Sequence, residues 1–458
     1  MTERAASRVA PAGRDQGRSS TLAGKRTGPL SDLRILDLTQ ALAGPYGTAL
    51  LADLGADVVK IEPPGGDISR PMAPLLKDYA PPGSKRPAGC DYGGYFASIN
   101  RNKRSIVLDL RRDEDRDRFL ELAVTADAVI ENSRVGVMDR LGVGYDILRG
   151  VNPQIVYAAI RGFGDPRTGE SPYAEWPAFD IVAQCMGGLV GITGPTGSAG
   201  FPNGASVGDL FPGALMALGV VSAVHAARQT GKGQFLDVSM YDAILSLCET
   251  LVINYSCANR VLGPRGSGHP ALCPFDVYET SDGAVAIAAP TDNHWEALCE
   301  IVGRPDLVED ERTRDNRRRS ENRPLVTEIL TAWTGARTKK EVVRLLGGKV
   351  PVGPVNNAAD VFADPHVWLR QMLVEIEPPG DNGTMMVVGT PIKLTETPAG
   401  VYRRPPRLGE HTAEILAEIR QGANPGADMR RDGCGPRGHR KRADREHSTG
   451  PRSPKETT

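Results

Sequence analysis

Short apolar runs alternate with stretches of helical periodicity along the first 160 residues of the chain. Apolar strands are predicted at 34–38, 57–61, 105–110, 128–132 and 155–160. Helices are expected between them at 44–55, from about 113 to 125, and at 137–148. Strands that alternate with helices at this spacing are typical of an α/β fold with a mainly parallel sheet.

The pattern changes character in the second half. A buried helix is predicted at 211–228, a strand at 234–240 and a mostly apolar helix at 241–255. A hairpin with an Asp-Gly turn follows at 275–288, and charged helical sequence fills 292–346. The stretches 259–268 and 350–354 look like linkers. We therefore expect a large α/β domain over 29–258, a small α+β domain over 259–349, and a return to the large domain over 350–420.

The two ends of the chain lack periodicity. Residues 1–28 contain six Lys or Arg against two acidic residues, and 421–458 are rich in Arg, Gly and Pro. We expect a disordered basic arm and a disordered tail. The net charge of the 458-residue chain is −1, which offers no general case for nucleic acid or membrane partners. No apolar run is long enough to span a bilayer and no secretory signal is evident, so a cytoplasmic location is expected.

Several common chemistries find no support in the sequence. The seven cysteines include no C-x-x-C pair, and no set of ligands stands at metal spacing, so reduced thiols and no metal are expected. The turn after the first strand, 39–45, is not a dinucleotide fingerprint, and no P-loop occurs. A serine nucleophile elbow is also missing. Carboxylates remain as the candidate reactive groups.

The stretch 176–213 carries the strongest candidate. It ends on Val207-Gly208-Asp209, immediately before the long apolar helix. Asp209 could cap that helix by accepting a hydrogen bond from the Phe211 amide. It could also be a nucleophile, because a helix N-terminus favours the ionised carboxylate. Asp180 and Glu175 are weaker candidates.

Basic residues gather near the predicted strand ends, where open α/β sheets bind ligands. These residues are Lys103, Arg104, Arg111, Arg134, Arg140 and Arg161. They indicate either a solvated rim of surface charge or a site for an anionic ligand with several phosphates.

Several segments together resemble the class III coenzyme A transferases of the CaiB/BaiF type, which include formyl-CoA and carnitine-CoA transferases and α-methylacyl-CoA racemases. The matching segments are RILDLTQALAGPYGTALLADLGADVVKIEPPGGD (34–67), NRNKRSIVLDL (100–110), IENSRVGVMDRLGVGYDIL (130–148), GFG (162–164), AQCMGGLVGITG (183–194), VGD (207–209), GKGQFLDVSMYDA (231–243), VPVGPV (350–355) and PPRLGEHT (405–412). The resemblance implies a Rossmann-like large domain built from both chain ends, an inserted small domain, and an interlocked homodimer.

The resemblance also implies site residues. The family's catalytic aspartate falls on Asp209, which would attack an acyl-CoA thioester and pass through a mixed anhydride and an aspartyl-CoA thioester. Contacts with CoA are implied for Ala41, Ala43, Leu108, Arg111, Asn132, Val137, Arg140, Arg161 and Met240, with Arg140 on the phosphates. The chain departs from the formyl-CoA transferases at Leu42, Pro63 and Ser133.

The leading hypothesis is therefore a transferase that moves CoA from an acyl-CoA, with succinyl-CoA as a candidate donor, to a carboxylic acid. CoA thioester is then a substrate, and no permanently bound cofactor is expected. An α-methylacyl-CoA racemase is the alternative. It is disfavoured because Phe179 stands where the racemases place an acid/base histidine, and Phe accepts no proton. A third hypothesis is a CoA-binding protein without turnover, in which Asp209 only caps a helix.

Overall fold

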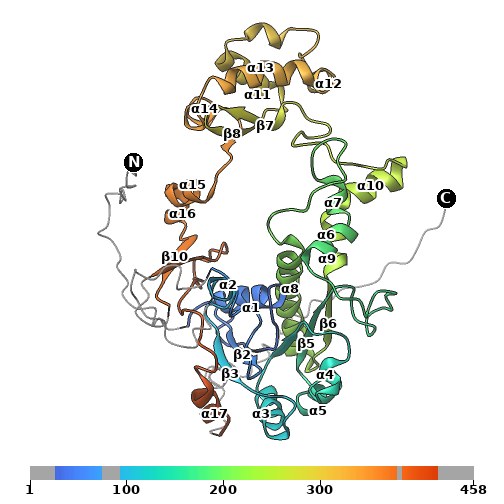
Figure 1. Ribbon diagram of the computed structural model, residues 1–458, viewed down its shortest axis with the longest axis vertical. Coiled ribbons are helices and arrows are strands. Elements are labelled where there is room, and N and C mark those ends of the chain that lie inside the picture. Colours follow the sequence, from blue (N-terminus) through green and yellow to red (C-terminus); the bar gives the residue numbers. More distant parts are fainter. Residues whose placement is uncertain (1–25, 75–92, 379–383, 421–458) are drawn as a thin grey trace, which may run out of the picture.

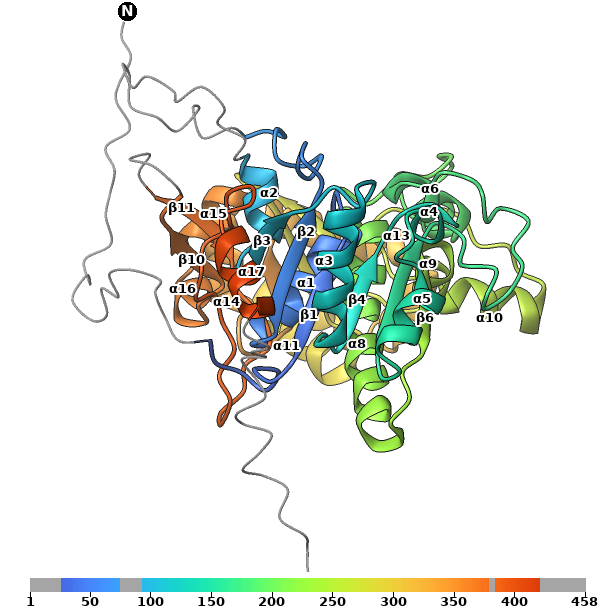
Figure 2. The same ribbon diagram turned by 90° about the horizontal axis from the view of Figure 1, so that it is seen from below.

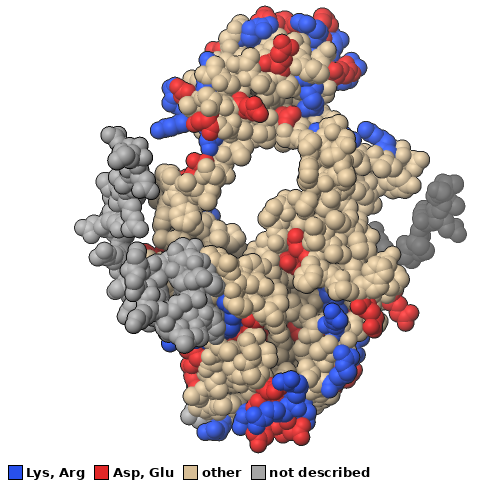
Figure 3. Space-filling model, in the orientation of Figure 1, with Lys and Arg blue, Asp and Glu red and all other residues tan. Residues whose placement is uncertain are grey.

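The computed structural model describes residues 26–74, 93–378 and 384–420. The expected disordered arm and tail, and most of the Pro- and Gly-rich loop over 67–94, lie outside the described residues. The described chain forms a large unit around a six-stranded sheet and a small unit over 275–354. Two arms of chain connect these units (Figure 1), and the space-filling view shows an opening between the two arms (Figure 3).

The central sheet contains the five strands predicted before residue 160 and one after it. The strands are β1 (Arg34–Asp37), β2 (Asp57–Glu62), β3 (Arg104–Val107), β4 (Ala128–Glu131), β5 (Val156–Arg161) and β6 (Phe235–Ser239). They are all parallel, in the order β3-β2-β1-β4-β5-β6. The order reverses between β1 and β4, and open sheets of this kind bind ligands at that point, beyond the carboxyl ends of the strands.

Helices cover both faces of the sheet (Figure 2). One core lies under α1 (Ala43–Asp53) and α8 (Val207–Thr230). The other lies under α3 (Asp113–Val124), α5 (Tyr145–Val151) and α17 (Thr412–Arg420). The buried strands are consequently apolar on both faces, which explains their continuous apolar runs in the sequence.

Shorter helices lie around the carboxyl end of the sheet, and those after residue 180 lead toward the small unit (Figure 1). They are α2 (Gly94–Ile99), α4 (Val137–Arg140), α6 (Asp180–Met186), α7 (Leu189–Ile192), α9 (Met240–Leu247) and α10 (Glu249–Ala258). The single helix expected at 241–255 is interrupted at Cys248, where α9 ends and α10 begins.

The small unit has its own core and an antiparallel sheet. Its elements are β7 (Phe275–Thr280), β8 (Gly283–Ala288), α11 (Asp292–Val302), η2 (Pro305–Val308), α12 (Asn316–Glu321), α13 (Arg323–Gly335), α14 (Lys339–Leu346) and β9 (Val352–Pro354). The predicted hairpin is confirmed, since β7 and β8 pair up to Thr280 and Gly283. The expectation of a linker at 350–354 is wrong, because β9 pairs with β8.

The chain then returns to the large unit. The elements of this return are α15 (Ala358–Ala363), α16 (Pro365–Leu369), β10 (Leu373–Ile376), β11 (Met385–Val388) and α17. Glu418 of α17 forms ion pairs with Arg34 at 2.7 Å and with Arg104 at 2.6 Å. These buried arginines begin β1 and β3, so the C-terminal segment is attached to the N-terminal strands.

Among the described helices, α8 alone is long and apolar enough to cross a bilayer by length and composition. Its apolar residues, such as Met216, Val220 and Val224, are buried against the sheet and α1. The hydropathy of α8 therefore has a structural explanation as a core helix.

Candidate active site

The start of α8 is fixed by the start of α6. The Gly208 amide donates a 2.7 Å hydrogen bond to Oδ1 of Asp180, the first residue of α6. A Cβ on Gly208 would lie 2.5 Å from the Asp180 carbonyl oxygen. A side chain at 208 would clash, and this requirement for glycine keeps the two helix ends in contact. Asp209 follows directly.

The N-terminal halves of α1 and α8 also pack backbone against backbone. A Cβ on Gly47 would lie 2.3 Å from the Gly213 carbonyl oxygen, and one on Gly213 would lie 2.4 Å from that of Ala43. Only glycine permits so close an approach. Asp209 is one helical turn before Gly213, so it lies toward the beginning of α1.

Asp209 is the third residue of α8, and the helix is preceded by Ser206. The expectation that Asp209 caps a helix starting near Phe211 is therefore wrong. Within the described part of the chain, no hydrogen bond reaches the Asp209 carboxylate. Burial, together with the charge of the neighbouring Asp180 carboxylate, raises the pKa of Asp209 to about 7. Desolvation and the like charge of Asp180 thus oppose the ionisation that a helix N-terminus favours.

Tyr95, on α2, is a site residue that the sequence did not single out. It is half-buried, and burial raises its phenol pKa together with the carboxylates of Asp209, Asp180 and Asp67. Its hydroxyl is therefore within electrostatic range of these three acidic side chains. The only sequence signal was a tyrosine next to a Pro- and Gly-rich loop, which gives no reason to place it beside residue 209.

Three predicted CoA contacts meet where the strand order reverses. Asn132, after β4, accepts from the Gln40 amide at 2.9 Å and donates to the Gln40 carbonyl at 2.8 Å. Ala41 follows with a φ of 66°, and Ala43 begins α1. The side chain of Asp67 accepts from the Ala41 amide. The structure thus assembles Ala41, Ala43 and Asn132 beside the start of α8.

The other apolar contacts are packed into the cores. Leu108 follows β3 and is buried in the core under α3, and Met240 begins α9 and is buried in the core under α8. Val137 begins α4 and packs against the first of these cores. Their contacts with CoA stay predictions.

The three predicted arginines differ in their surroundings. Arg140 ends α4, is exposed, and has no ion-pair partner within the described residues. Arg111 is also exposed, but its guanidinium forms two hydrogen bonds, at 2.7 and 2.8 Å, with Asp109. Arg161 is buried between Glu131 at 2.7 Å and Asp165 at 3.1 Å. Arg140 is therefore the guanidinium most available to a phosphate.

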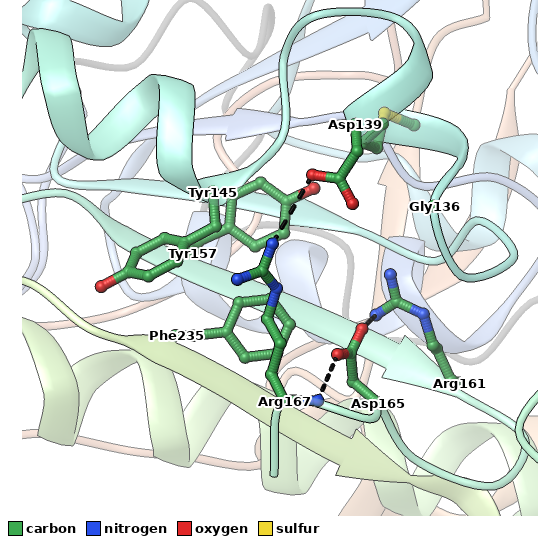
Figure 4. A pocket seen from close by; sticks show the side chains of 9 residues that line it. Gly136, Asp139, Tyr145, Tyr157, Arg161, Asp165, Arg167 and Phe235 are labelled. Carbon is green, nitrogen blue, oxygen red and sulfur yellow. Dashed lines mark hydrogen bonds and ion pairs between the residues drawn. The ribbon is translucent and has the colours of Figure 1, made fainter. Parts of the chain in front are cut away.

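A small pocket lies between α4 and Arg161 (Figure 4). Its lining consists of Gly136, Met138, Asp139, Tyr145, Tyr157, Arg161, Asp165, Arg167 and Phe235. The Arg167 guanidinium lies 5.6 Å from the centre of the Phe235 ring, which stacks on Tyr157. Nε of Arg161 is buried without a hydrogen-bond partner.

Two of the basic residues expected at the rim belong instead to the interior. Lys103 and Arg104 precede and begin β3, and both are buried. Lys103 pairs with Asp37 at 2.9 Å, and Arg104 pairs with Asp57 at 2.7 Å. They stabilise the sheet and leave no charge for a ligand. The described residues also include no group of three His, Cys, Asp or Glu side chains placed to hold a metal ion.

Comparison with known proteins identifies the family of the chain. The sequence profile of CoA-transferase family III matches residues 30–412. The chain belongs to this family. It is therefore an enzyme of the class III CoA-transferases, and the resemblance seen in the sequence is confirmed.

Individual relatives cover nearly the same span. The succinyl-CoA:mesaconate CoA-transferase of Haloarcula marismortui is 48% identical over 391 residues, which is 85% of this chain and 96% of the relative. The acetyl-CoA:oxalate CoA-transferase of Acetobacter aceti is 36% identical, over 88% of this chain and 98% of the relative. The crystal structure of a CaiB/BaiF family protein from Brucella suis superposes with a TM-score of 0.75 at 34% identity, covering 86% of this chain and all of that one.

Proposed function

We propose that this transferase moves CoA from succinyl-CoA to a short dicarboxylic acid of the mesaconate type, with Asp209 as the nucleophile. The observation that carries the proposal is the Asp209 carboxylate itself. It is partly buried, accepts no hydrogen bond among the described residues, and lies near the beginnings of α1, α6 and α8. The relative at 48% identity is named for this donor and acceptor.

The reaction follows from a carboxylate in this position. Ionised Asp209 attacks the thioester carbonyl of the donor, and the C–S bond breaks to give a mixed anhydride and CoA thiolate. The thiolate then attacks the Asp209 carbonyl, which releases the donor acid and leaves an aspartyl-CoA thioester. The acceptor carboxylate attacks this thioester, which expels CoA thiolate and forms a second mixed anhydride between Asp209 and the acceptor. The thiolate then attacks the acceptor's carbonyl, giving the acceptor's CoA thioester and the free Asp209 carboxylate. One difficult exchange is thereby divided into easier steps.

The start of α1 supplies donors for the oxyanion of each tetrahedral intermediate. The first amides of a helix have no partner within it, and α1 has no side-chain cap. The N–H groups of Leu42, Ala43 and Gly44 are therefore suited to bind developing negative charge near Asp209. The Tyr95 hydroxyl adds a donor on the α2 side.

We further propose that two chains interlock as a homodimer. Large exposed apolar side chains lie on the two arms that join the units, among them Tyr255, Val261, Trp368 and Leu369. The walls of the opening between the units are largely free of charged side chains on the face shown in Figure 3. An arm of a second copy passing through this opening would cover such surfaces.

The proposed function is tested by mixing the purified protein with succinyl-CoA and mesaconate. Chromatography should show mesaconyl-CoA and free succinate forming in equal amounts. The Asp209→Asn variant, which keeps the shape of the side chain, should form neither. Hydrolysis of succinyl-CoA without transfer, or full transfer by Asp209→Asn, would contradict the proposal.

A further inference from the structure

The turn after β1 is held almost entirely by side chains from elsewhere. Thr39 donates its amide to Asp37 at 2.9 Å, and its carbonyl accepts from Nζ of Lys60 at 2.8 Å. Both backbone groups of Gln40 bond to Asn132, and the Ala41 amide donates to Oδ1 of Asp67 at 3.3 Å. These hydrogen bonds hold the backbone of the turn without any contribution from a substrate.

Ala41 needs such support. Its φ of 66° lies in the left-handed region, which is sterically unfavourable for a residue that carries a Cβ. The residue stands two positions before the first residue of α1. An unsupported Ala41 would relax toward negative φ and change the direction of the Leu42 and Ala43 amides at the start of α1.

The support for Ala41 is a fully buried ion pair. Nζ of Lys60, from β2, lies 2.8 Å from Oδ2 of Asp67, and both side chains are 0% exposed. Oδ1 of Asp67 serves the Ala41 amide and also accepts from the amide and hydroxyl of Ser69 at 2.8 and 2.7 Å. Oδ2 of Asp67 thus pairs with Lys60, and Oδ1 accepts hydrogen bonds from the turn and from Ser69.

Both members of the pair are charged. Burial alone would raise the pKa of Asp67, but the Lys60 ammonium and the hydrogen bonds from Lys60 and Ser69 lower it below its usual range. Burial likewise disfavours the charge on Lys60, but Asp37, Asp67 and Glu62 outweigh it and raise the pKa of Lys60. Buried pairs are often replaceable by apolar side chains without loss of stability. A contribution to stability therefore does not by itself explain the presence of the Lys60–Asp67 pair.

We propose that Asp67, oriented by Lys60, is a positioning residue that holds Ala41 in its left-handed conformation and so aims the first amides of α1 at the reacting carbonyl. This inference rests on the proposed function. The pair itself is fully buried and acts on the substrate only through the turn, where Lys60 holds Thr39 and Asp67 holds Ala41. Donors aimed at the transition state change kcat more than KM when they are displaced.

Two matched double variants separate the hydrogen bond from the charge. Lys60→Met/Asp67→Leu removes both charges and the acceptor for Ala41. Lys60→Met/Asp67→Asn removes the same charges but keeps an oxygen for the Ala41 amide. The first should lose about tenfold or more in kcat with the KM for succinyl-CoA nearly unchanged, as expected for displaced oxyanion donors. The second should keep at least a third of the wild-type kcat, by the same reasoning.

A third variant tests the backbone directly. Adding Ala41→Gly to Lys60→Met/Asp67→Leu removes the steric penalty at φ 66° and should restore kcat at least about threefold. Circular dichroism and thermal unfolding of all three show whether each is folded. If the pair has only a structural role, each variant should lose Tm and active fraction together. The kcat of the folded protein should then not differ between Leu and Asn at position 67.

The inference is overturned if the Leu and Asn variants, both folded, share the same kcat, or if the loss is in KM alone. The proposed function fails in a different way, since wild type would then not transfer CoA or Asp209→Asn would remain active. The two failures are therefore distinguishable in one set of assays.

Discussion

Oδ1 of Asp180 accepts a 2.7 Å hydrogen bond from the Gly208 amide, one residue before Asp209. The same carboxylate accepts from the buried Gln184 side chain, which also binds the amide of Asn203 in the loop leading to α8. One acidic side chain thus fixes the position of Asp209 and opposes its ionisation. The position of Asp209 and its raised pKa therefore both depend on the Asp180 side chain.

Replacing Asp180 by Asn should separate these two effects. Asn keeps an oxygen for the Gly208 amide but removes the charge that helps to raise the pKa of Asp209. Wild-type kcat/KM should rise with pH up to about 7, where Asp209 ionises. The midpoint for Asp180→Asn should fall by about one pH unit, the effect of a neighbouring charge. Glu175→Gln, an exposed change on the same segment, should leave the midpoint in place, and equal midpoints in all three proteins would disprove the coupling.

Asp209 should also lower the stability of the protein. Its pKa is raised on folding from 3.8 to about 7, so the folded state binds this proton more tightly than the unfolded state. Stability is therefore lost as pH rises from about 4 to 7, and the loss is complete above 7. Asp209→Asn should unfold at least about 2 °C above wild type at pH 8 and at the same temperature near pH 4. Equal Tm values for wild type and Asp209→Asn at pH 8, measured by differential scanning calorimetry, would show that folding does not raise the pKa of Asp209.

The sheet was largely predictable, because strands buried on both faces are visible as apolar runs. The strand positions at 34–38, 57–61 and 128–132 needed only the alternation of apolar and helical segments. The pairing of β9 with β8 was not predictable, because a three-residue strand that follows Pro351 and ends on Pro354 resembles a linker. Lys103 and Arg104 were misplaced for a related reason: a sequence shows charge but not the buried acidic partner.

Arg140 should bind CoA through its charge. Arg140→Ala should raise the KM for succinyl-CoA about tenfold, which is the loss of one charge-assisted hydrogen bond. The kcat should change less than about twofold, since the phosphates are remote from the reacting carbonyl. Arg149→Ala, an exposed arginine on the neighbouring α5, is the matched control and should leave KM unchanged. A fall in kcat at constant KM would place Arg140 outside the CoA site.

The homodimer depends on apolar side chains that a single chain leaves exposed. Leu369, at the end of α16, is 83% exposed, and Leu369→Asp should place an unpaired charge in the proposed interface. Sedimentation should show a dimer for wild type and a monomer or aggregate for this variant. Val124→Asp, at the end of α3, adds the same charge at an exposed site away from the opening and should remain a dimer. A wild-type monomer with full activity would refute the interlocked arrangement.

The candidate site was predictable only in part. Asp209 could be found from the sequence because a short motif precedes a long apolar helix. Its environment could not, because the contacts that create it join segments far apart in the chain: Gly47 with Gly213, and Ala41 with Asp67. Tyr95 and the Lys60–Asp67 pair are likewise defined by packing, for which the sequence carries no local pattern.

Oxygen transfer to Asp209 tests the central claim most directly. In the proposed reaction, the acceptor's attacking oxygen stays on Asp209 when the thiolate takes the acyl group. After turnover with succinyl-CoA and oxygen-18-labelled mesaconate, mass spectrometry of the digested protein should find heavy oxygen in the peptide containing Asp209 and in no other. Turnover that leaves Asp209 unlabelled, or that places the label on another residue, would contradict the account.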